Sequence, residues 1–476
     1  MEVIAIQSIK KNFLYNAFYN ILVLILPIIT APYISRVMGA EKIGVYSYSY
    51  SIVSYFGLFI LLGLSNYGNR TVASVRENRE KLSKTFCAIY GMQIIMGLLV
   101  ILLYLIYIIY FSSNKTMAII QLIYLLSVTL DINWFFFGLE PFKLTVTRNT
   151  IIKIITMILI FTFVNNKNDI YIYAIIMQIG PLTGQLILWR FLKKYIDISI
   201  PCISDIKKHI KPNIVLFIPV IALSLYTIMD KVMLGLLSNM IEVGYYENAN
   251  KLTTIPTMAI TSLGTVMLPR ISNLIANGDI ENSKKYTEKS LIFSVILSSS
   301  MSFGLSAISK EFVPFFYGTG YEKCIQLIPI LVFATNFISW GNVLRTQYLI
   351  PNSKDIVYIK SAFLGAVVNV VINLLLIHSL KSIGTAIGTL FAEAAVCLYI
   401  SYKVKKHIKI SKIFKLCIPL MLIGFIMYII VINVPFISSN LITLVIKVAV
   451  GGIVYLALFL VYYKMGLNRI ISLKRL

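Results

Sequence analysis

The chain has 476 residues, of which 58% are hydrophobic and only 13% are charged, and its mean hydropathy is +0.84. A soluble domain carries about a quarter of its residues as charges, so this composition excludes a soluble fold and predicts that the protein lies in a bilayer. The formal net charge of +24 does not indicate nucleic-acid binding, because the basic residues flank apolar runs and no polar domain is present to carry a binding patch.

Fourteen apolar stretches are long enough to cross the hydrocarbon core of a bilayer and predict transmembrane helices. They predict an all-α, polytopic membrane protein with no loop long enough to fold as a domain. The longest polar connections are 66–84, 190–212 and 270–289. In chain order the stretches are 13–35, 43–65, 85–110, 116–138, 149–164, 169–190, 213–237, 245–268, 290–309, 325–348, 356–379, 382–402, 414–434 and 440–463.

The distribution of Lys and Arg predicts the orientation of these helices. If the N-terminus is cytoplasmic, 31 of the 43 basic residues fall on the cytoplasmic side, 7 fall outside and 5 lie within helices. A shift by one helix would move every later loop to the other side and destroy this asymmetry. We therefore expect both termini in the cytoplasm. The first apolar run is too long for a signal peptide and is expected to stay as the first helix.

The sequence gives no sign of a metal site, a cofactor or a disulfide framework. Five cysteines are scattered without CxxC spacing and are expected to be packing residues. Nothing resembles a nucleotide-binding P-loop, so ATP is not expected to drive the protein directly. The cysteines are Cys87, Cys202, Cys324, Cys397 and Cys417.

An internal repeat appears when the sequence is compared with itself at an offset of 200 residues. The offset spans six helices, an even number, so the two halves share their orientation and form a parallel repeat. We predict an N-lobe of helices one to six (1–200), a C-lobe of helices seven to twelve (201–408) and two appended helices (409–476). The matching positions are Gly44-Val45-Tyr46 with Gly244-Tyr245-Tyr246, Arg70 with Arg270, and Ser83-Lys84 with Ser283-Lys284.

Several motifs between the N-terminus and about residue 400 resemble those of Wzx-type polysaccharide flippases, members of the superfamily that also contains MATE multidrug exporters and lipid II flippases. The resemblance implies a two-lobed fold around a central cavity that alternates its access between the two sides of the membrane. It also implies a substrate that is a lipid-linked oligosaccharide on an undecaprenyl pyrophosphate carrier. The motifs are SRVMGAEKIGVYS (35–47), YGNR (67–70) with Ala73 and Arg76, DINWFFFGLE (131–140), DKVMLG (230–235), GYY (244–246) and LPRIS (268–272).

Carboxylates and aromatic residues within the apolar stretches are candidate cavity residues, because an ionisable group at membrane depth needs a partner or a wet cavity. Asp131 and Trp134 are interpreted as a cavity carboxylate beside a sugar-stacking ring, or as a helix–helix hydrogen bond with an interfacial tryptophan. Asp230 and Lys231 are adjacent, so they point about 100° apart and cannot simply pair with each other. One of the two is expected to face the cavity or the opposite lobe.

Cations along the chain are candidate ligands of a pyrophosphate, for which the forked donors of arginine are well suited. The candidates are Arg70, Arg270, Arg345, Lys360 and Lys153. Anchoring at the cytoplasmic surface is the alternative for the repeat-related pair Arg70 and Arg270, and snorkelling to the headgroups is the alternative for the lysines. Lys251 is expected to form an i,i+4 ion pair with Glu247. Glu393 is a candidate for binding a coupling cation, with a structural hydrogen bond as the alternative.

These features predict a non-enzymatic flippase that moves undecaprenyl-pyrophosphate-linked repeat units across the cytoplasmic membrane for O-antigen, capsule or a related surface polysaccharide. Its expected partners are the lipid-linked glycan, membrane lipids, and the polymerase and glycosyltransferases of the same pathway. A multidrug or cation exporter and a lipid II flippase are the alternatives within the superfamily. A membrane glycosyltransferase or polymerase is disfavoured by the short external loops, which are poor in carboxylates.

Overall fold

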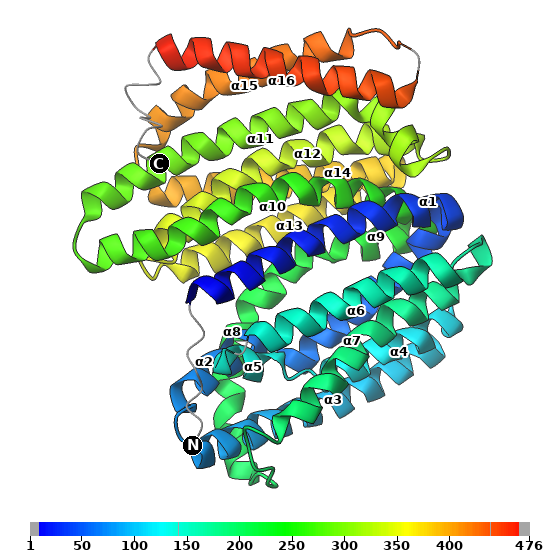
Figure 1. Ribbon diagram of the computed structural model, residues 1–476, viewed down its shortest axis with the longest axis vertical. Helices are drawn as coiled ribbons and strands as arrows, with labels where there is room; N and C mark the ends of the chain where they lie inside the picture. Colours follow the sequence, from blue (N-terminus) through cyan, green and yellow to red (C-terminus); the bar gives the residue numbers. More distant parts are fainter. Residues whose placement is uncertain (1–8, 141, 438, 466–476) are drawn as a thin grey trace. The chain divides into compact units, whose positions relative to one another are not determined.

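The computed structural model describes residues 9–465 except 141 and 438, and these residues form helices and connections without a β-strand (Figure 1). The chain divides into two compact units, Met1–Ser224 and Leu225–Leu476. Residues 1–8 and 466–476 lie outside the described part, so the predicted cytoplasmic location of both termini stays a prediction. The division into two six-helix lobes and an appended pair also stays a prediction.

The first unit contains the helices that come from the first six predicted spans and the first part of the seventh. Side-chain caps begin several of them: Asn78 accepts a hydrogen bond from the amide of Lys81, and Asn114 accepts one from the amide of Met117. The helices are α1 (Ile9–Leu61), α2 (Leu64–Val75), α3 (Arg79–Tyr110), α4 (Lys115–Thr129), α5 (Asn133–Leu139), α6 (Phe142–Phe163), the short 3₁₀ helix η1 (Lys167–Asp169), α7 (Ile170–Leu192) and α8 (Ile203–Thr227), which runs across the boundary.

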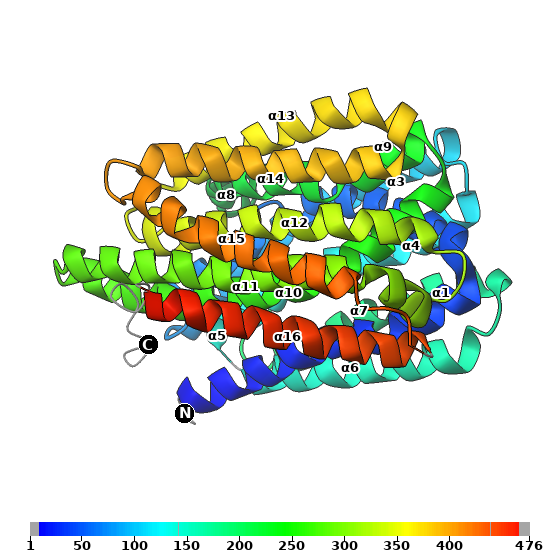
Figure 2. The same cartoon turned by 90° about the horizontal axis from the view of Figure 1, so that it is seen from above.

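The second unit contains the remaining helices. In it, α15 and α16 pack against each other and against α11 (Figures 1 and 2). The helices are α9 (Met229–Leu237), α10 (Met240–Ala276), α11 (Ile280–Tyr317), α12 (Glu322–Leu344), the π-helical turn η2 (Arg345–Leu349), α13 (Asp355–Leu380), α14 (Ser382–Val404), α15 (Ile410–Ile432) and α16 (Asn440–Met465).

Thirteen helical segments of the described chain are long and apolar enough to cross a membrane. One of them, Ile25–Val75, has 51 residues, whereas a single span needs about 20. Within α1 the backbone at Gly39 leaves the helical region (φ 73°, ψ 168°), so α1 consists of two helices joined at a kink. The part of α1 before Gly39 corresponds to the first predicted span and the part after it to the second. With α1 counted as two spans, the predicted total of fourteen is confirmed.

The helices differ from the predicted spans in two ways. The connection 66–84 was expected to be a polar loop, but α2 occupies most of it. Two predicted spans are also broken: residues 130–132 separate α4 from α5, and Ile228 separates α8 from α9. Apolar residues continue on both sides of each break over the length of one span, so the apolar pattern predicted a single helix in each case.

The interior of each unit is apolar and aromatic. In the first unit Phe86 stacks on Trp134 and meets Phe135 edge-on, with ring centroids 5.5 and 4.9 Å apart. In the second unit a cluster around Trp340 and Leu344 joins α11, α12, α14 and α15. The helices that pack around these cores also carry the polar groups described below.

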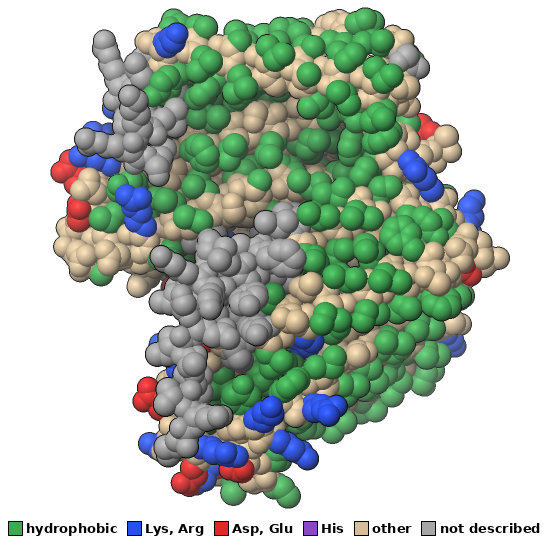
Figure 3. Space-filling model, viewed as in Figure 1, with side chains coloured by type: hydrophobic (Ala, Val, Ile, Leu, Met, Phe, Trp, Pro, Cys, Tyr) green, Lys and Arg blue, Asp and Glu red, His purple; other side chains and the backbone are tan. Residues whose placement is uncertain are grey.

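The outer faces of the helices are also apolar. Leu98, Leu102 and Ile453 are each at least 60% exposed. Figure 3 shows hydrophobic side chains covering the helices on the visible face, with Lys, Arg, Asp and Glu gathered towards helix ends. Apolar sides with charged ends are what a bilayer requires, and the chain is a multi-pass membrane protein.

Candidate functional site: a polar cavity in the first unit

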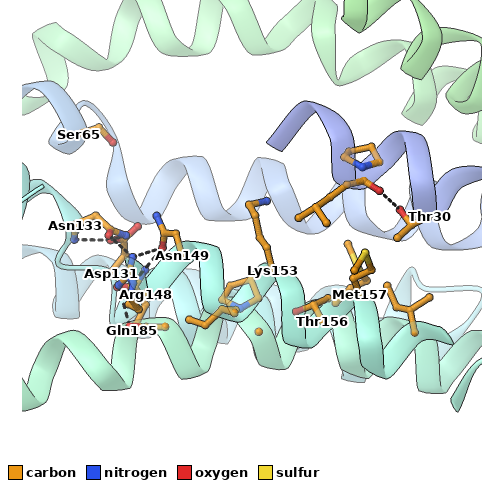
Figure 4. Close-up of a pocket in the computed structure, with 18 of the residues that line it drawn as sticks. Thr30, Ser65, Asp131, Asn133, Arg148, Asn149, Lys153, Thr156, Met157 and Gln185 are labelled. Carbon is orange, nitrogen blue, oxygen red and sulfur yellow. Dashed lines mark hydrogen bonds between the residues drawn. The ribbon is translucent and has the colours of Figure 1, made fainter. Parts of the chain in front are cut away.

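A cavity of about 520 Å³ lies within the first unit, between α1, α6, α7 and the break that separates α4 from α5 (Figure 4). The α6 residues that line the cavity recur every three or four positions, so they lie on one face of the helix. The same spacing recurs on α7. The α6 residues are Arg148, Asn149, Ile152, Lys153, Thr156, Met157 and Ile160, and the α7 residues are Met177, Gly180, Pro181, Gly184 and Gln185.

Two glycines on α7 allow α6 to approach closely. A Cβ atom at Gly180 would lie 2.9 Å from the hydroxyl oxygen of Thr156, and one at Gly184 would lie 3.0 Å from a methyl carbon of Ile152. This pattern of small residues four apart is common where membrane helices pack tightly. Close packing here keeps the polar groups of α6 beside those of α7.

The break between α4 and α5 forms one end of the cavity, and side chains satisfy the backbone carbonyls that it frees. The amide of Gln93 donates to the carbonyls of Val128, Thr129 and Asp131 at 3.0, 3.1 and 2.8 Å. The indole of Trp189 donates to the carbonyl of Leu130 at 2.9 Å. Non-helical backbone at membrane depth is tolerated only where partners of this kind are present.

Asp131 lies in this break, two residues before the first residue of the short helix α5. Its Oδ1 atom accepts hydrogen bonds from the backbone amide and from the side-chain amide of Asn133, both at 2.7 Å. Trp134 is only 2% exposed, and its indole N–H donates to Gln93 and to the carbonyl of Asp131 at 3.0 and 3.1 Å. The two predicted site residues therefore meet at the cavity, with the ring of Trp134 packed mainly in the core.

Arg148 lies at the start of the polar face of α6 and is only 7% exposed. Its guanidinium donates to the carbonyl of Gly184 at 2.9 Å, to Oδ1 of Asn133 at 2.9 Å and to Oδ1 of Asn149 at 2.6 Å. Because Asn133 also bonds Asp131, a continuous chain of hydrogen bonds links the arginine to the carboxylate. A buried cation held in this way is fixed in orientation.

Lys153 is the second cation of the cavity. It is half-buried, and Figure 4 shows it extending between the Asp131–Arg148 cluster on one side and Thr30 and Met157 on the other. Among the residues that the structure describes, none forms a hydrogen bond or ion pair with its ammonium group. A desolvated ammonium without a counter-charge favours an anionic ligand.

The sequence did not single out Arg148, Asn149 or Gln185. Arg148 directly precedes the predicted fifth span, so it was counted among the cytoplasmic loop cations. The signal that could have found it is the helical spacing of Asn149, Lys153 and Thr156, which makes a polar stripe in an otherwise apolar run.

Arg70, by contrast, is exposed on α2 and does not line this cavity. Its repeat-related partner Arg270 is exposed near the end of α10, where its guanidinium carbon lies 4.2 Å from the ring centre of Tyr286. The two arginines belong to different units. Their predicted role with a pyrophosphate stays a prediction.

In the second unit, Asp230 and Lys231 take different partners, as their positions on the helix predict. Asp230 is 1% exposed and accepts four hydrogen bonds, from Tyr246, Asn369, Asn373 and Thr389, at 2.6 to 2.9 Å. Lys231 pairs with Glu247 at 3.1 Å, and the predicted i,i+4 pair of Lys251 with Glu247 is present at 3.4 Å.

Among the other candidates of the second unit, Glu393 lies close enough to Asp230 and Arg345 for their charges to act on it. Arg345 donates to the hydroxyl of Tyr358 at 2.9 Å and Lys360 is exposed. Glu393 is half-buried on α14 and, within the described residues, has no hydrogen-bond partner. No cluster of three or more His, Cys, Asp or Glu side chains suited to a metal ion occurs in the described part of the chain.

A bundle of membrane-length helices that encloses a polar cavity is the construction of a membrane transport protein. Residues 9–275 match the family model described as "Polysaccharide biosynthesis protein", and the chain belongs to this family. A curated relative from Escherichia coli (strain K12), named "Putative O-antigen transporter", is 22% identical over 394 residues, which cover 82% of this chain and 95% of the relative.

Two solved structures share the fold. A lipid II flippase, MurJ, in an inward closed conformation superposes with a TM-score of 0.79 at 16% identity, covering 95% of this chain and 99% of that one. An inward-facing MATE multidrug transporter superposes with a TM-score of 0.61 at 12% identity, covering 82% and 96%. The resemblance seen in the sequence motifs is therefore confirmed at the level of family and fold.

Proposed function

We propose that this protein is a flippase that moves lipid-linked oligosaccharide repeat units across the bacterial cytoplasmic membrane during the synthesis of a surface polysaccharide. Membership of the polysaccharide biosynthesis family and the similarity to a protein named as an O-antigen transporter support this substrate class. The fold shared with a lipid II flippase is consistent with it.

The cavity of the first unit is the observation that carries the proposal. Arg148 and Lys153 line it beside amide and hydroxyl groups, and both belong to the membrane-length segment Leu144–Phe163. Phosphate oxygens suit such cations, and the amides and hydroxyls can exchange hydrogen bonds with sugar hydroxyls. A pyrophosphate-linked glycan on an undecaprenyl carrier has both kinds of group, while its hydrocarbon chain can remain in the bilayer.

The transport cycle that we infer is alternating access between two lobes, without a chemical step on the substrate. Glu393 is the candidate for coupling to a cation gradient, because it is a half-buried carboxyl group in an apolar helix. The polymerase and glycosyltransferases of the same pathway are the expected partners. A cationic drug is a poor ligand for the cavity, since two of its three charged side chains are cations and the hydrogen-bond chain through Asn133 already engages Asp131.

Substitution of Lys153 tests this proposal in cells that lack the chromosomal gene. We expect Lys153→Ala to lower surface polysaccharide at least about tenfold, because it removes a charge-assisted contact worth roughly 1.5–3 kcal/mol. Lys153→Arg should retain activity, and Lys193→Ala, at an exposed lysine outside the cavity, should have no effect. The measurements are surface polymer and protein abundance. Normal polymer from well-expressed Lys153→Ala would contradict the proposed role of the cavity.

A further inference from the structure

Five lysines surround a concave site where α14 connects to α15 in the second unit. The site has a volume of about 710 Å³, and we call it the lysine pocket. The connection lies between two membrane-length segments, Ser382–Val404 and Ile410–Ile432, so the pocket is at the surface of the bilayer. Its residues are Lys405, Lys406, Lys409, Ile410, Ser411, Lys412 and Lys415.

The lysines of the pocket have no counter-charge among the residues that the structure describes. Each of the nine ion pairs in the described chain involves other residues. Lys405 lies 4.0 Å from the ring centre of Tyr402, a contact that orients the ammonium group without neutralising it. Elsewhere on the surface, Lys84, Lys208 and Lys285 each pair with a carboxylate of their own helix, whereas Lys193 and Lys194 form no ion pair within the described chain.

The start of α15, like those of α2 and α14, lacks both a side-chain cap and an acidic first turn. Its first turn contains no acidic residue, its N-cap is Lys409, and no side chain caps it. The first amide N–H groups of a helix have no partner within it, and cations there oppose the helix dipole. By contrast, α10 and α11 begin with Asn239 and Asp279, each of which accepts a hydrogen bond from a backbone amide. The amide of Ile410 donates to the carbonyl of Ile408 at 2.8 Å, and an anion in the pocket would accept from the amides that follow it and from the lysines.

An apolar stripe leads away from the pocket along α15. Phe414, Ile418, Leu422 and Phe425 follow helical spacing on one face and are 44–61% exposed. On α14, Tyr402 and Leu398 are similarly exposed just before the connection. Figure 2 shows this connection at one end of the helices of the second unit. Cations at the membrane surface above an apolar stripe match a molecule that has an anionic head and hydrocarbon chains.

We propose that the lysine pocket binds the phosphate headgroup of an anionic phospholipid, with the acyl chains along the exposed stripe of α15. This lipid would be a resident ligand that fixes the start of α15 at the membrane surface, and it is distinct from the transported glycan. A diffuse excess of cations in cytoplasmic loops attracts anionic lipids without fixed positions. The uncapped helix and the shape of the pocket predict a saturable site.

The test is a titration of the purified full-length protein with cardiolipin or phosphatidylcholine, in which native mass spectrometry counts the bound lipids. We expect the double variant Lys409→Gln/Lys412→Gln to bind cardiolipin roughly 30-fold more weakly, from about fivefold for each lysine. Lys409→Arg/Lys412→Arg should bind like the unchanged protein. The matched control is Lys193→Gln/Lys194→Gln, which removes two exposed lysines from another connection and should leave the affinity unchanged.

Three results would overturn the proposal. Equal weakening by the pocket variant and the control variant would mean that only diffuse charge attracts the lipid. Equal binding of phosphatidylcholine and cardiolipin would mean that the pocket does not select an anionic lipid. Displacement of cardiolipin by inorganic pyrophosphate at a similar concentration would mean that the pocket recognises a free phosphate group and not a lipid.

Discussion

Asp230 and Lys153 are both ionisable groups inside the membrane region, but their surroundings differ. Asp230 is buried and accepts four hydrogen bonds, whereas no described residue bonds to the ammonium group of Lys153. A carboxylate with four fixed donors is a structural centre of its unit, because removing it would take an acceptor away from four donors at once. A cation that faces a cavity without a partner is available to a ligand.

Substitution of Asp230 should therefore act on stability. We expect Asp230→Ala to destabilise the protein by at least about 3 kcal/mol, because buried donors without acceptors cost roughly 1–3 kcal/mol each. Asp230→Asn should cost less, since the hydroxyls of Tyr246 and Thr389 can turn from donating to accepting. Thermal unfolding in detergent measures both. An unchanged midpoint for Asp230→Ala would show that the four hydrogen bonds contribute nothing to stability.

For single residues, the sequence could identify as candidates those whose charge interrupts an apolar run. Asp131, Lys231 and the Glu247–Lys251 pair are examples, because a charge within a span is visible without a structure. Arg148 was missed, since a cation at the edge of a span looks like an ordinary loop residue. Contacts between helices, such as the bonds of Asp230 to Asn369 and Asn373, depend on packing that no local pattern encodes.

The kink in α1 depends on the backbone conformation of a single residue, Gly39, which divides α1 into two helices. Gly39 has φ 73° and ψ 168°, a region that is essentially restricted to glycine, and no atom lies within 4 Å of the position a Cβ would take. A substitution there therefore tests backbone strain without steric contact.

We expect Gly39→Ala to destabilise the protein by about 1–3 kcal/mol, the usual cost of holding a non-glycine residue in this region. Gly452→Ala is the matched control. It also has open space around its Cβ position, but it lies inside α16 without positive φ, so alanine should be neutral or stabilising there. Equal thermal midpoints for the two variants would contradict the assignment of strain to Gly39.

The positions of the membrane-length helices could be predicted from the sequence, but the positions of the breaks within them could not. Fourteen apolar runs correspond to the observed spans, because the cost of exposing backbone to lipid leaves helix as the available structure. The break at 130–132 lies within such a run and depends on Gln93 and Trp189, which are distant in sequence. Its position follows from tertiary hydrogen bonds, which hydropathy does not report.

Orientation across the membrane is a property of the whole molecule, and the chain contains a natural probe of it. Among the five cysteines only Cys202 is exposed, in the connection between α7 and α8, while the other four are buried. The positive-inside rule places this connection in the cytoplasm. A membrane-impermeant maleimide should therefore label Cys202 in inside-out vesicles and not in intact spheroplasts.

The control for this labelling is Ser113→Cys in a Cys202→Ser background. Ser113 is exposed in the connection between α3 and α4, which the same rule places outside. This variant should show the opposite pattern. Labelling of Cys202 from outside would reverse the predicted orientation of every loop.

The central claim is that the protein itself transfers a lipid-linked glycan between leaflets. The direct measurement is a reconstitution in which vesicles carry the undecaprenyl-pyrophosphate-linked repeat unit in one leaflet and a glycan-binding probe monitors the other. We predict that the glycan appears only when the protein is present, and at least about tenfold more slowly with Lys153→Ala than with Lys153→Arg. Transfer at the same rate in protein-free vesicles, or no transfer by the folded protein, would contradict the account.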